Sequence, residues 1–434
     1  MAKMNTAQQN AASAIEAMVR AGATQAQCVL SSEYTHDFRL ESGQVTLLRT
    51  LGGRQNLALK AFFGTKVGQF SMGIGSSKDI DYAAHQCVTA AAPAMDNPYQ
   101  GMNVAAGDSN LLGGGAEIDK ALYLERLREL AHDAKALFPR ASLKQVFGRH
   151  YGGVDIYLNT HGVQLIQPKG YYSLFMMMGG VDGTQLGTTV TVSANLHTLE
   201  QPLSAHPIIR QALETSEKTI RRQPFGEKKT GTLVLTPGSL NYFMQMAMGA
   251  FAGELALISG TSRWQNRLGE AVASEPLSMM SAPNHPELVG ARRFTDEGFV
   301  CAEQPIIQNG TLRSLLCSLY AANKTGLPRG ASPGGSLVVA PGEAAIADII
   351  SGIKDGILMH RFSGGFPQTS GDFSGVAKNS FIIRNGEIIG AADSAMVSGN
   401  LADILMNLRG LSRETLSDGS FIMPYAAFDG ITIQ

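Results

Sequence analysis

The 434-residue sequence is poor in cysteine and in charge, and each shortage excludes a class of protein. Four widely separated cysteines cannot build a disulfide framework or a paired-cysteine metal site. Charged residues make up only 16% of the chain, and 35 Lys+Arg nearly balance 36 Asp+Glu, so no excess of positive charge favours nucleic acid as a partner. With 44% hydrophobic residues, we expect a globular protein with buried cores.

Long uninterrupted hydrophobic runs are also missing. The first 20 residues contain no apolar segment of the kind that a signal peptide has. The most apolar stretch, residues 240–258, is interrupted by Asn241, Gln245 and Glu254, which a lipid-facing helix would rarely carry together. We therefore interpret this stretch as a buried core helix and expect a cytoplasmic protein with no membrane partner.

Glycine is abundant, at 49 residues, and predicts many turns between short strands. Apolar residues at helical spacing predict helices at residues 6–21, 79–92, 118–137 and 208–221. Strands are expected at 27–33, 38–41, 44–50, 55–63 and 66–72, then at 143–147, 153–159, 162–167, 171–178 and 188–192, and again at 231–235. Residues 97–115 are predicted to form a linker or long loop, because they are rich in Gly, Asn and Asp.

This order of elements predicts an α+β fold with three domains. The first, residues 1–100, would hold an antiparallel sheet with helices, and the second, residues 116–225, would be a central α+β domain. The third, residues 226–434, would be mainly antiparallel β-structure around the buried apolar helix. Two Asn-Gly pairs in this last section, Asn309-Gly310 and Asn385-Gly386, lie between apolar runs and predict tight hairpins.

Motifs that carry chemistry are mostly absent. The chain has no Walker loop, and none of its nine histidines lies in HExxH. Residues 330–334 match GxSxG, but Pro333 directly follows the serine and a strand is expected after it, so the match does not indicate a nucleophile elbow. From the residues alone, no catalytic centre can be assigned.

Polar residues flanked by glycine gather in three segments of the last section. These are Asp296-Glu297-Gly298, Arg329-Gly330 and residues 368–375, which include Asp372 and Ser374. Such segments suit a binding site lined by backbone, and ordinary turns use the same residues. The sequence leaves both interpretations open.

Several longer segments resemble the TldD/PmbA family, which is known for metalloproteases and was once described as modulators of DNA gyrase. The resemblance covers nearly the whole chain and rests on segments at residues 51–53, 64–68, 294–298, 307–312, 320–326, 370–374 and 383–388. It implies a TldD/PmbA-like α+β fold.

In TldD-type chains of the family, the apolar C-terminal helix carries an HExxxH zinc signature, and a later cysteine helps to hold the metal. The corresponding positions here are Gln245, Met246 and Ala250, and no cysteine follows Cys317. An amide is a poor zinc ligand, alanine has no donor atom and methionine cannot act as a general base. The resemblance therefore implies a PmbA-type (TldE-type) chain with no catalytic residues and no metal of its own.

By the same resemblance, the expected partner is a TldD-type chain in a heterodimeric peptidase that degrades or matures unfolded proteins and peptides, with zinc held only by the partner. This chain would shape the cavity and bind peptide or partner, and Asp296, Glu297, Arg329, Asp372 and Ser374 are the candidate peptide-binding residues. An extended peptide can be held by strand addition to a strand-rich protein.

Two alternatives stay open. One is a stand-alone homodimer that binds peptides without any peptidase partner. The other is a peptidase that uses Asp296, Glu297, Asp372 or Cys301 in a site without metal, which would require carboxylates held in a suitable geometry.

Overall fold

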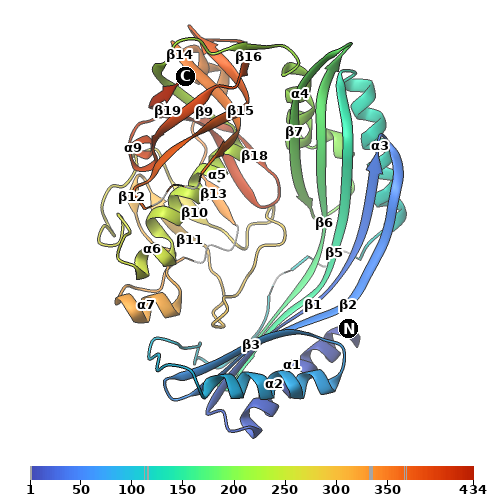
Figure 1. The fold of residues 1–434 in the computed structure, drawn as a ribbon, viewed down its shortest axis with the longest axis vertical. Coiled ribbons are helices and arrows are strands. Elements are labelled where there is room, and N and C mark those ends of the chain that lie inside the picture. Colours follow the sequence, from blue (N-terminus) through green and yellow to red (C-terminus); the bar gives the residue numbers. More distant parts are fainter. Residues whose placement is uncertain (1, 112, 115–116, 332–335, 366, 368) are drawn as a thin grey trace.

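The computed structural model describes residues 2–111, 113–114, 117–331, 336–365, 367 and 369–434. Ser332 and Pro333 of the GxSxG match lie outside the described residues, and so does position 368 of the last polar segment. The described chain folds into two sheets with helices, which confirms the predicted α+β class. Figure 1 shows a long curved sheet running the length of the molecule and the C-terminal half, coloured yellow to red, beside it.

Sheet A contains seven strands within the described residues, in the order β3-β2-β1-β5-β6-β4, with β7 pairing β6. Neighbouring strands in this sheet are antiparallel, except that β4 and β6 are parallel. The strands are β1 (Gln25–Glu41), β2 (Gln44–Phe63), β3 (Lys66–Ile74), β4 (Gly107–Asn110), β5 (Ala141–Asn159), β6 (Val163–Asp182) and β7 (Gln185–Leu196). Strands of the first two predicted domains thus pair in one sheet, and the three-domain division stays a prediction.

The four longest strands of sheet A were each expected as two shorter strands, and this part of the prediction was wrong. β1 continues through Tyr34 with a shift in its register against β2, so that the strand bends without ending. Opposite this bend, β5 carries Gly152 and Gly153. A side chain at Gly152 would overlap the Tyr34 ring, and one at Gly153 would overlap the Ser32 carbonyl. These glycines therefore permit close approach inside a continuous strand, where the sequence analysis expected a gap between two strands.

Helices cover sheet A at both ends, near the positions predicted for them. They are α1 (Ala2–Arg20), α2 (Ser77–Ala91), α3 (Lys120–Leu137) and α4 (Pro207–Lys218), with a short turn η1 (Leu203–Ala205). Figure 1 shows α1 and α2 at one end of the sheet and α3 and α4 at the other. In α1, the fully buried Ala7, Ala11, Ala14 and Met18 recur at helical spacing, so small side chains bring the helix close to the sheet.

Sheet B forms the C-terminal half and is mixed but mainly antiparallel. Its path is β12-β11-β10-β13-β19-β9-β14-β15-β16-β8, with β17 and β18 attached to it. The strands are β8 (Arg222–Pro224), β9 (Lys229–Leu235), β10 (Met279–Ser281), β11 (Gln304–Gln308), β12 (Thr311–Leu312), β13 (Leu337–Val339), β14 (Asp355–Gly364), β15 (Asp372–Arg384), β16 (Glu387–Asp393), β17 (Met396–Asn400), β18 (Leu408–Ser417) and β19 (Phe421–Ile433).

Both predicted Asn-Gly hairpins are confirmed, between β11 and β12 and between β15 and β16. Asn309 and Gly310 both have positive φ, at 48° and 73°, and Asn385 and Gly386 follow the same pattern at 47° and 84°. Asparagine tolerates this left-handed conformation better than most residues with a side chain, and glycine adopts it freely.

The buried apolar helix is real but interrupted. It consists of α5 (Pro237–Ala247), a π-helical turn η2 (Met248–Ala252) and α6 (Glu254–Ile258), and the helices α7 (Leu319–Thr325), α8 (Ile346–Ser351) and α9 (Leu401–Met406) complete this half. The break occurs at Gly253, whose backbone is extended and forms a bridge with Leu316. The predicted helix is therefore interrupted at a residue that makes a tertiary contact, and it resumes as α6. Among the described residues, the structure contains no helix that is both long and apolar enough to span a membrane.

Candidate functional site

Helix α5 carries Gln245 to the edge of a cavity. The helix begins at Pro237 directly after β9, where proline suits the first helical turn because its missing N–H needs no partner there. One face of α5 is buried through Phe243, Met244 and Met246, whereas Gln245 is exposed. The sequence of the helix thus fixes which side faces the core and leaves the amide of Gln245 available to a ligand.

The cavity beside Gln245 has a volume of about 520 Å³. It brings together four of the sequence-predicted positions, namely Gln245, Asp296, Glu297 and Arg329, which lie on three separate segments of the chain. The remaining walls combine glycines, apolar side chains and the ends of short helices, and they include Met248, Gly249, Gly253, Glu254, Arg292, Phe294, Thr295, Leu316, Cys317, Ser318, Leu319, Gly330 and Ala331. A cleft of this size with a few convergent polar groups is typical of a binding site.

Sheet A holds the loop that carries Asp296 and Glu297. Gln27 on β1 donates from Nε2 to the Asp296 carbonyl at 2.8 Å, and the Tyr157 hydroxyl on β5 donates to the Glu297 carbonyl at 3.1 Å. The Asn103 backbone N–H also donates to the Glu297 carbonyl, at 2.7 Å. These bonds satisfy two backbone carbonyl groups of an irregular loop and involve neither carboxylate.

Gly298 lets this loop turn against the sheet. Its φ is +83°, and a side chain at this position would overlap the Tyr157 ring. Tyr157 is fully buried and packs near Phe294, with ring centroids 6.3 Å apart. The position of the two acidic residues therefore depends on a tyrosine that lies 140 residues away in the sequence.

The charged groups of the cavity are partly paired. Arg292 forms an ion pair with Asp296 at 2.6 Å, and its side chain is 39% exposed. The guanidinium carbon of Arg329 lies 4.0 Å from the centroid of the Phe299 ring, which favours a cation–π contact. Glu254 and Glu297 complete an arrangement of both charge signs, which suits a polar, extended ligand better than a purely apolar one.

The cysteine in this cavity is a thiol at neutral pH. Burial raises the pKa of Cys317, the nearby Glu254 carboxylate raises it further, and a hydrogen bond with Thr325 opposes them. A nucleophilic cysteine needs the opposite shift, because the thiolate is the reactive form. The surroundings of Cys317 do not favour covalent catalysis.

Two of the sequence-predicted binding residues lie elsewhere. Asp372 and Ser374 are exposed at the start of β15, and neither lines the cavity. Asp372 accepts a hydrogen bond from Asn400 at 2.7 Å, and this bond, with one from Ser370, lowers the pKa of the aspartate. Asn400 in turn caps α9, so Asp372 has a structural partner at the end of a helix.

Sequence reasoning missed Arg292, Glu254 and Cys317 as members of the site. Arg292 adjoins the predicted segment at Phe294 and could have been included on proximity alone. Glu254 and Cys317 carried no usable signal, because they approach Gln245 only after the helix breaks at Gly253 and that glycine pairs with the strand-like segment at Leu316.

Comparison with known proteins identifies a family model and several relatives that match this chain. A profile described as the PmbA/TldA metallopeptidase C-terminal domain matches residues 228–434. The protein named "Metalloprotease PmbA homolog" from Haemophilus influenzae is 24% identical over 295 residues, which cover 64% of this chain and 63% of that protein. The family model over residues 228–434 and the names of the relatives support the TldD/PmbA family for this chain.

One further relative and one solved structure extend the match along the chain. A protein named "Metalloprotease" from Methanothermobacter thermautotrophicus is 26% identical over 340 residues, covering 71% of this chain and 73% of its own length. The crystal structure of TldE from Thermococcus kodakarensis superposes with a TM-score of 0.80 over 97% of this chain and 99% of that chain, at 18% identity. At this low identity, the superposition supports a shared TldD/PmbA-like fold.

The three positions that the resemblance aligns with the zinc signature, 245, 246 and 250, offer no usual zinc ligand. Gln245 offers only an amide, Met246 is fully buried with its thioether in the core, and Ala250 has no donor atom. Zinc sites in proteins use histidine, cysteine or carboxylate ligands, at least three of which must converge. Across the described part of the chain, His, Cys, Asp and Glu side chains form no group of three or more that could hold a metal ion.

Proposed function

We propose that this chain is a non-catalytic, PmbA-type subunit of a TldD/PmbA-type peptidase, and that zinc and the catalytic base belong to a TldD-type partner. The observation that carries the proposal is the environment of positions 245, 246 and 250. Gln245 lines the cavity, but its side-chain amide is a poor ligand for zinc. Met246 and Ala250 are buried and contribute to the core. At the helix where the family resemblance places the metal, this chain therefore has residues that cannot bind zinc, and two of them add buried apolar surface.

The role left for the chain is to bind and position a peptide. The cavity of about 520 Å³ is large enough for a few residues of an extended chain. The guanidinium groups of Arg292 and Arg329 can bind peptide carbonyl or carboxylate groups, and Glu254 and Glu297 can accept peptide N–H groups. Because such contacts are mostly to the main chain, they support binding of unfolded segments with little sequence preference.

Peptide cleavage by this chain alone is less well supported. Asp296 is ion-paired with Arg292 at 2.6 Å, and Asp372 lies outside the cavity. Cys301 is buried and does not line the cavity. These residues therefore lack the convergent acid–base geometry that a non-metal peptidase needs.

The first test measures metal content and peptide cleavage for the chain alone, for a TldD-type chain alone and for the two mixed. We expect no stoichiometric zinc in this chain, a heterodimer on size exclusion, and cleavage of an unfolded substrate only when the partner is present. Zinc near one per chain, or cleavage by the lone chain, would refute the proposal. A homodimer that binds peptide but never the partner would favour the stand-alone alternative.

A cavity-filling substitution tests the peptide role. Gly249 lines the cavity, has no positive φ, and has no neighbouring atom within 4 Å of the place that a Cβ atom would take, so Gly249→Leu would occupy the cavity without an internal clash. Gly238→Leu is a matched control, because Gly238 is also exposed, lies in the preceding helix α5 and has nothing within 4 Å. We expect Gly249→Leu to lower cleavage by the heterodimer at least tenfold and Gly238→Leu to leave it unchanged. Equal effects would argue against peptide binding in this cavity.

A further inference from the structure

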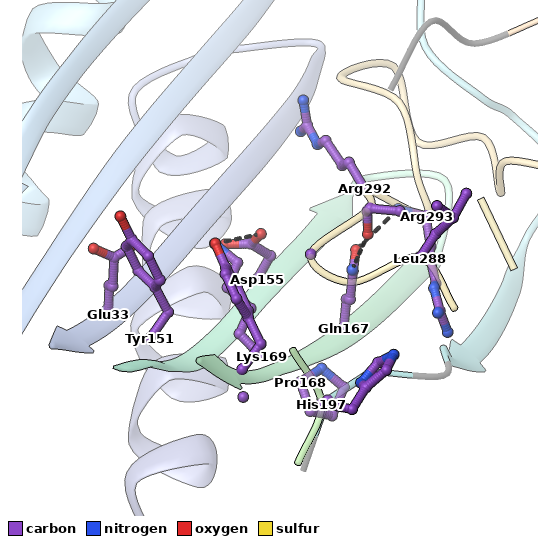
Figure 2. Close-up of a pocket in the computed structure, with 16 residues that line it drawn as sticks. Glu33, Tyr151, Asp155, Gln167, Pro168, Lys169, His197, Leu288, Arg292 and Arg293 are labelled. Carbon is purple, nitrogen blue, oxygen red and sulfur yellow. Dashed lines mark hydrogen bonds and ion pairs between the residues drawn. The ribbon is translucent and has the colours of Figure 1, made fainter. Parts of the chain in front are cut away.

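A second cavity, of about 240 Å³, lies between sheet A and the segment 288–293 (Figure 2). Gln167 on β6 fixes this segment with both ends of its side-chain amide. Its Nε2 donates to the Ala291 carbonyl at 2.7 Å, and its Oε1 accepts from the Arg293 backbone N–H at 3.0 Å. The backbone from which Arg293 projects is therefore held in place by a buried amide.

Arg293 is a buried cation without an anion among the described residues. The residue is only 9% exposed, and its Nε and Nη1 atoms are buried with no hydrogen-bond partner in the described part of the chain. Burial lowers the pKa of this guanidinium, and no carboxylate of the described residues opposes the effect. The preceding residue, Arg292, is by contrast paired with Asp296 at 2.6 Å. Figure 2 shows the two arginine side chains extending in different directions, Arg293 on the side of His197.

An unpaired buried charge is costly, since it has given up hydration without gaining a counter-charge. A carboxylate that entered the cavity would supply that counter-charge, and guanidinium–carboxylate hydrogen bonds are among the strongest that proteins form. Arg293 lines the cavity together with His197 and Tyr171. The site is thus suited to the charged end of a small ligand.

The other wall of the cavity offers an acceptor. Asp155 is paired with Lys169 at 2.7 Å, and its side chain is 14% exposed. The second carboxylate oxygen, Oδ1, is buried and has no hydrogen-bond partner within the described residues. In the view of Figure 2, Asp155 and Lys169 lie on one side of Gln167 and Arg293 on the other. An N–H group of a ligand would satisfy Oδ1, whereas a second negative group would be repelled by it.

Two tyrosines stiffen this wall. The rings of Tyr151 and Tyr171 are stacked, with centroids 4.8 Å apart and an interplanar angle of 24°. Burial raises the pKa of Tyr171 to about 12, with smaller contributions from nearby residues, so its hydroxyl is neutral at physiological pH. The wall therefore adds a flat, uncharged surface against which a peptide unit can pack.

We propose that this cavity binds the C-terminal end of a peptide, with Arg293 holding the terminal carboxylate and Asp155 accepting an N–H of the same ligand. The choice of a peptide rests on the proposed function. It has independent support from two Arg293 nitrogens and the Asp155 Oδ1 atom, which have no hydrogen-bond partner among the described residues. Arg292 lines both this cavity and the larger one beside Gln245, so the two cavities adjoin. A peptide end anchored at Arg293 would lie beside the site where the remainder of the peptide binds.

The test is isothermal titration calorimetry on the full chain without any partner. The probe is N-acetyl-trialanine as the free acid, compared with the same peptide as its C-terminal amide and with inorganic phosphate. We expect the acid to bind at least tenfold more tightly than the amide, since one charge-assisted contact is lost in the amide. Arg293→Met should abolish the difference and Arg293→Lys should reduce it, while Arg221→Gln, at an arginine whose side chain is 80% exposed, should leave it unchanged.

Thermal unfolding without ligand separates a binding role from a structural one. Because Arg293 lacks an anion in the described chain, Arg293→Met should leave the melting temperature unchanged or raise it, as often happens when an unpaired functional charge is removed. A large fall in melting temperature would show that Arg293 is needed for folding and would overturn the proposal. Equal binding of acid and amide, or phosphate binding more tightly than the acid, would overturn it as well. Loss of partner-dependent cleavage with acid selectivity intact would count against the proposed function alone.

Discussion

The substitution Gly298→Ala tests whether sheet A positions the acidic loop of the peptide cavity. A non-glycine residue at φ +83° costs about 1–2 kcal/mol, because the left-handed conformation crowds a side chain against its own backbone. The added methyl group would also overlap the ring of the fully buried Tyr157. Overpacking of this kind costs roughly 1–3 kcal/mol, so we expect a total loss of about 2–5 kcal/mol in the free energy of unfolding.

The matched control is Gly326→Ala. Gly326 has nearly the same φ, +75°, at the end of α7, but no neighbouring atom lies within 4 Å of the added methyl position. It should therefore show the backbone cost alone, about 1–2 kcal/mol. The difference between the two variants measures the contact with Tyr157.

Urea unfolding followed by the fluorescence of Trp264 is a suitable assay, because this single tryptophan is 1% exposed in the C-terminal half. In the heterodimer, Gly298→Ala should also weaken peptide binding, since it displaces Asp296 and Glu297, whereas Gly326→Ala should not. If the two variants lose equal stability, then the packing of Gly298 on Tyr157 does not hold the loop, and our account of how the site is positioned is wrong.

Two further predictions concern buried titratable groups. Burial raises the pKa of Asp37, but ion pairs with Arg149 and Arg49, each at 2.6 Å, outweigh it and lower the pKa overall. Asp37→Asn should therefore cost about 2–4 kcal/mol at neutral pH, measured by urea unfolding. This loss should shrink below about pH 4, where the unfolded chain binds a proton at Asp37, and should vanish once the pH has passed the lowered pKa of the folded state. Burial lowers the pKa of His360 to about 4, with a smaller effect from Lys218. As the pH falls from about 6.5 to 4, the unfolded chain therefore binds a proton at His360 and the folded chain does not. The wild-type protein should lose stability across this pH range, and His360→Gln should lose about 2 kcal/mol less. Parallel plots of unfolding free energy against pH for the two proteins would contradict the lowered pKa of His360.

Local chemistry made several elements predictable. The two Asn-Gly hairpins follow from residues that accept positive φ, and α1 through α4 follow from apolar spacing that every helix of this length must show if one face is buried. The α+β class was predictable for the same reason, since both periodicities occur in the chain. Boundaries were less certain, because strand ends depend on pairing partners as well as on the strand itself.

The long strands of sheet A could not be predicted at their full length. The predicted strands 143–147 and 153–159 leave a gap that includes Gly152, because glycine is depleted in strands. The actual role of Gly152 and Gly153 is to leave room for Tyr34 and for the Ser32 carbonyl on the neighbouring strand. The paired residues of β1 and β5 lie more than 100 positions apart in the sequence. Only this pairing shows that the strand bends at these glycines and does not end there.

The candidate site divides in the same way. The residue types at Gln245, Met246 and Ala250 fix which donor atoms these positions can offer to a metal, because no fold can add a donor atom to a side chain. That Gln245, Glu297 and Arg329 line one cavity, and that Asp372 lies outside it, follows from the folded arrangement of distant segments. This arrangement also places Arg293 in a buried position without a counter-charge among the described residues. Proximity and burial arise from contacts between distant segments, and no local pattern in the chain encodes them.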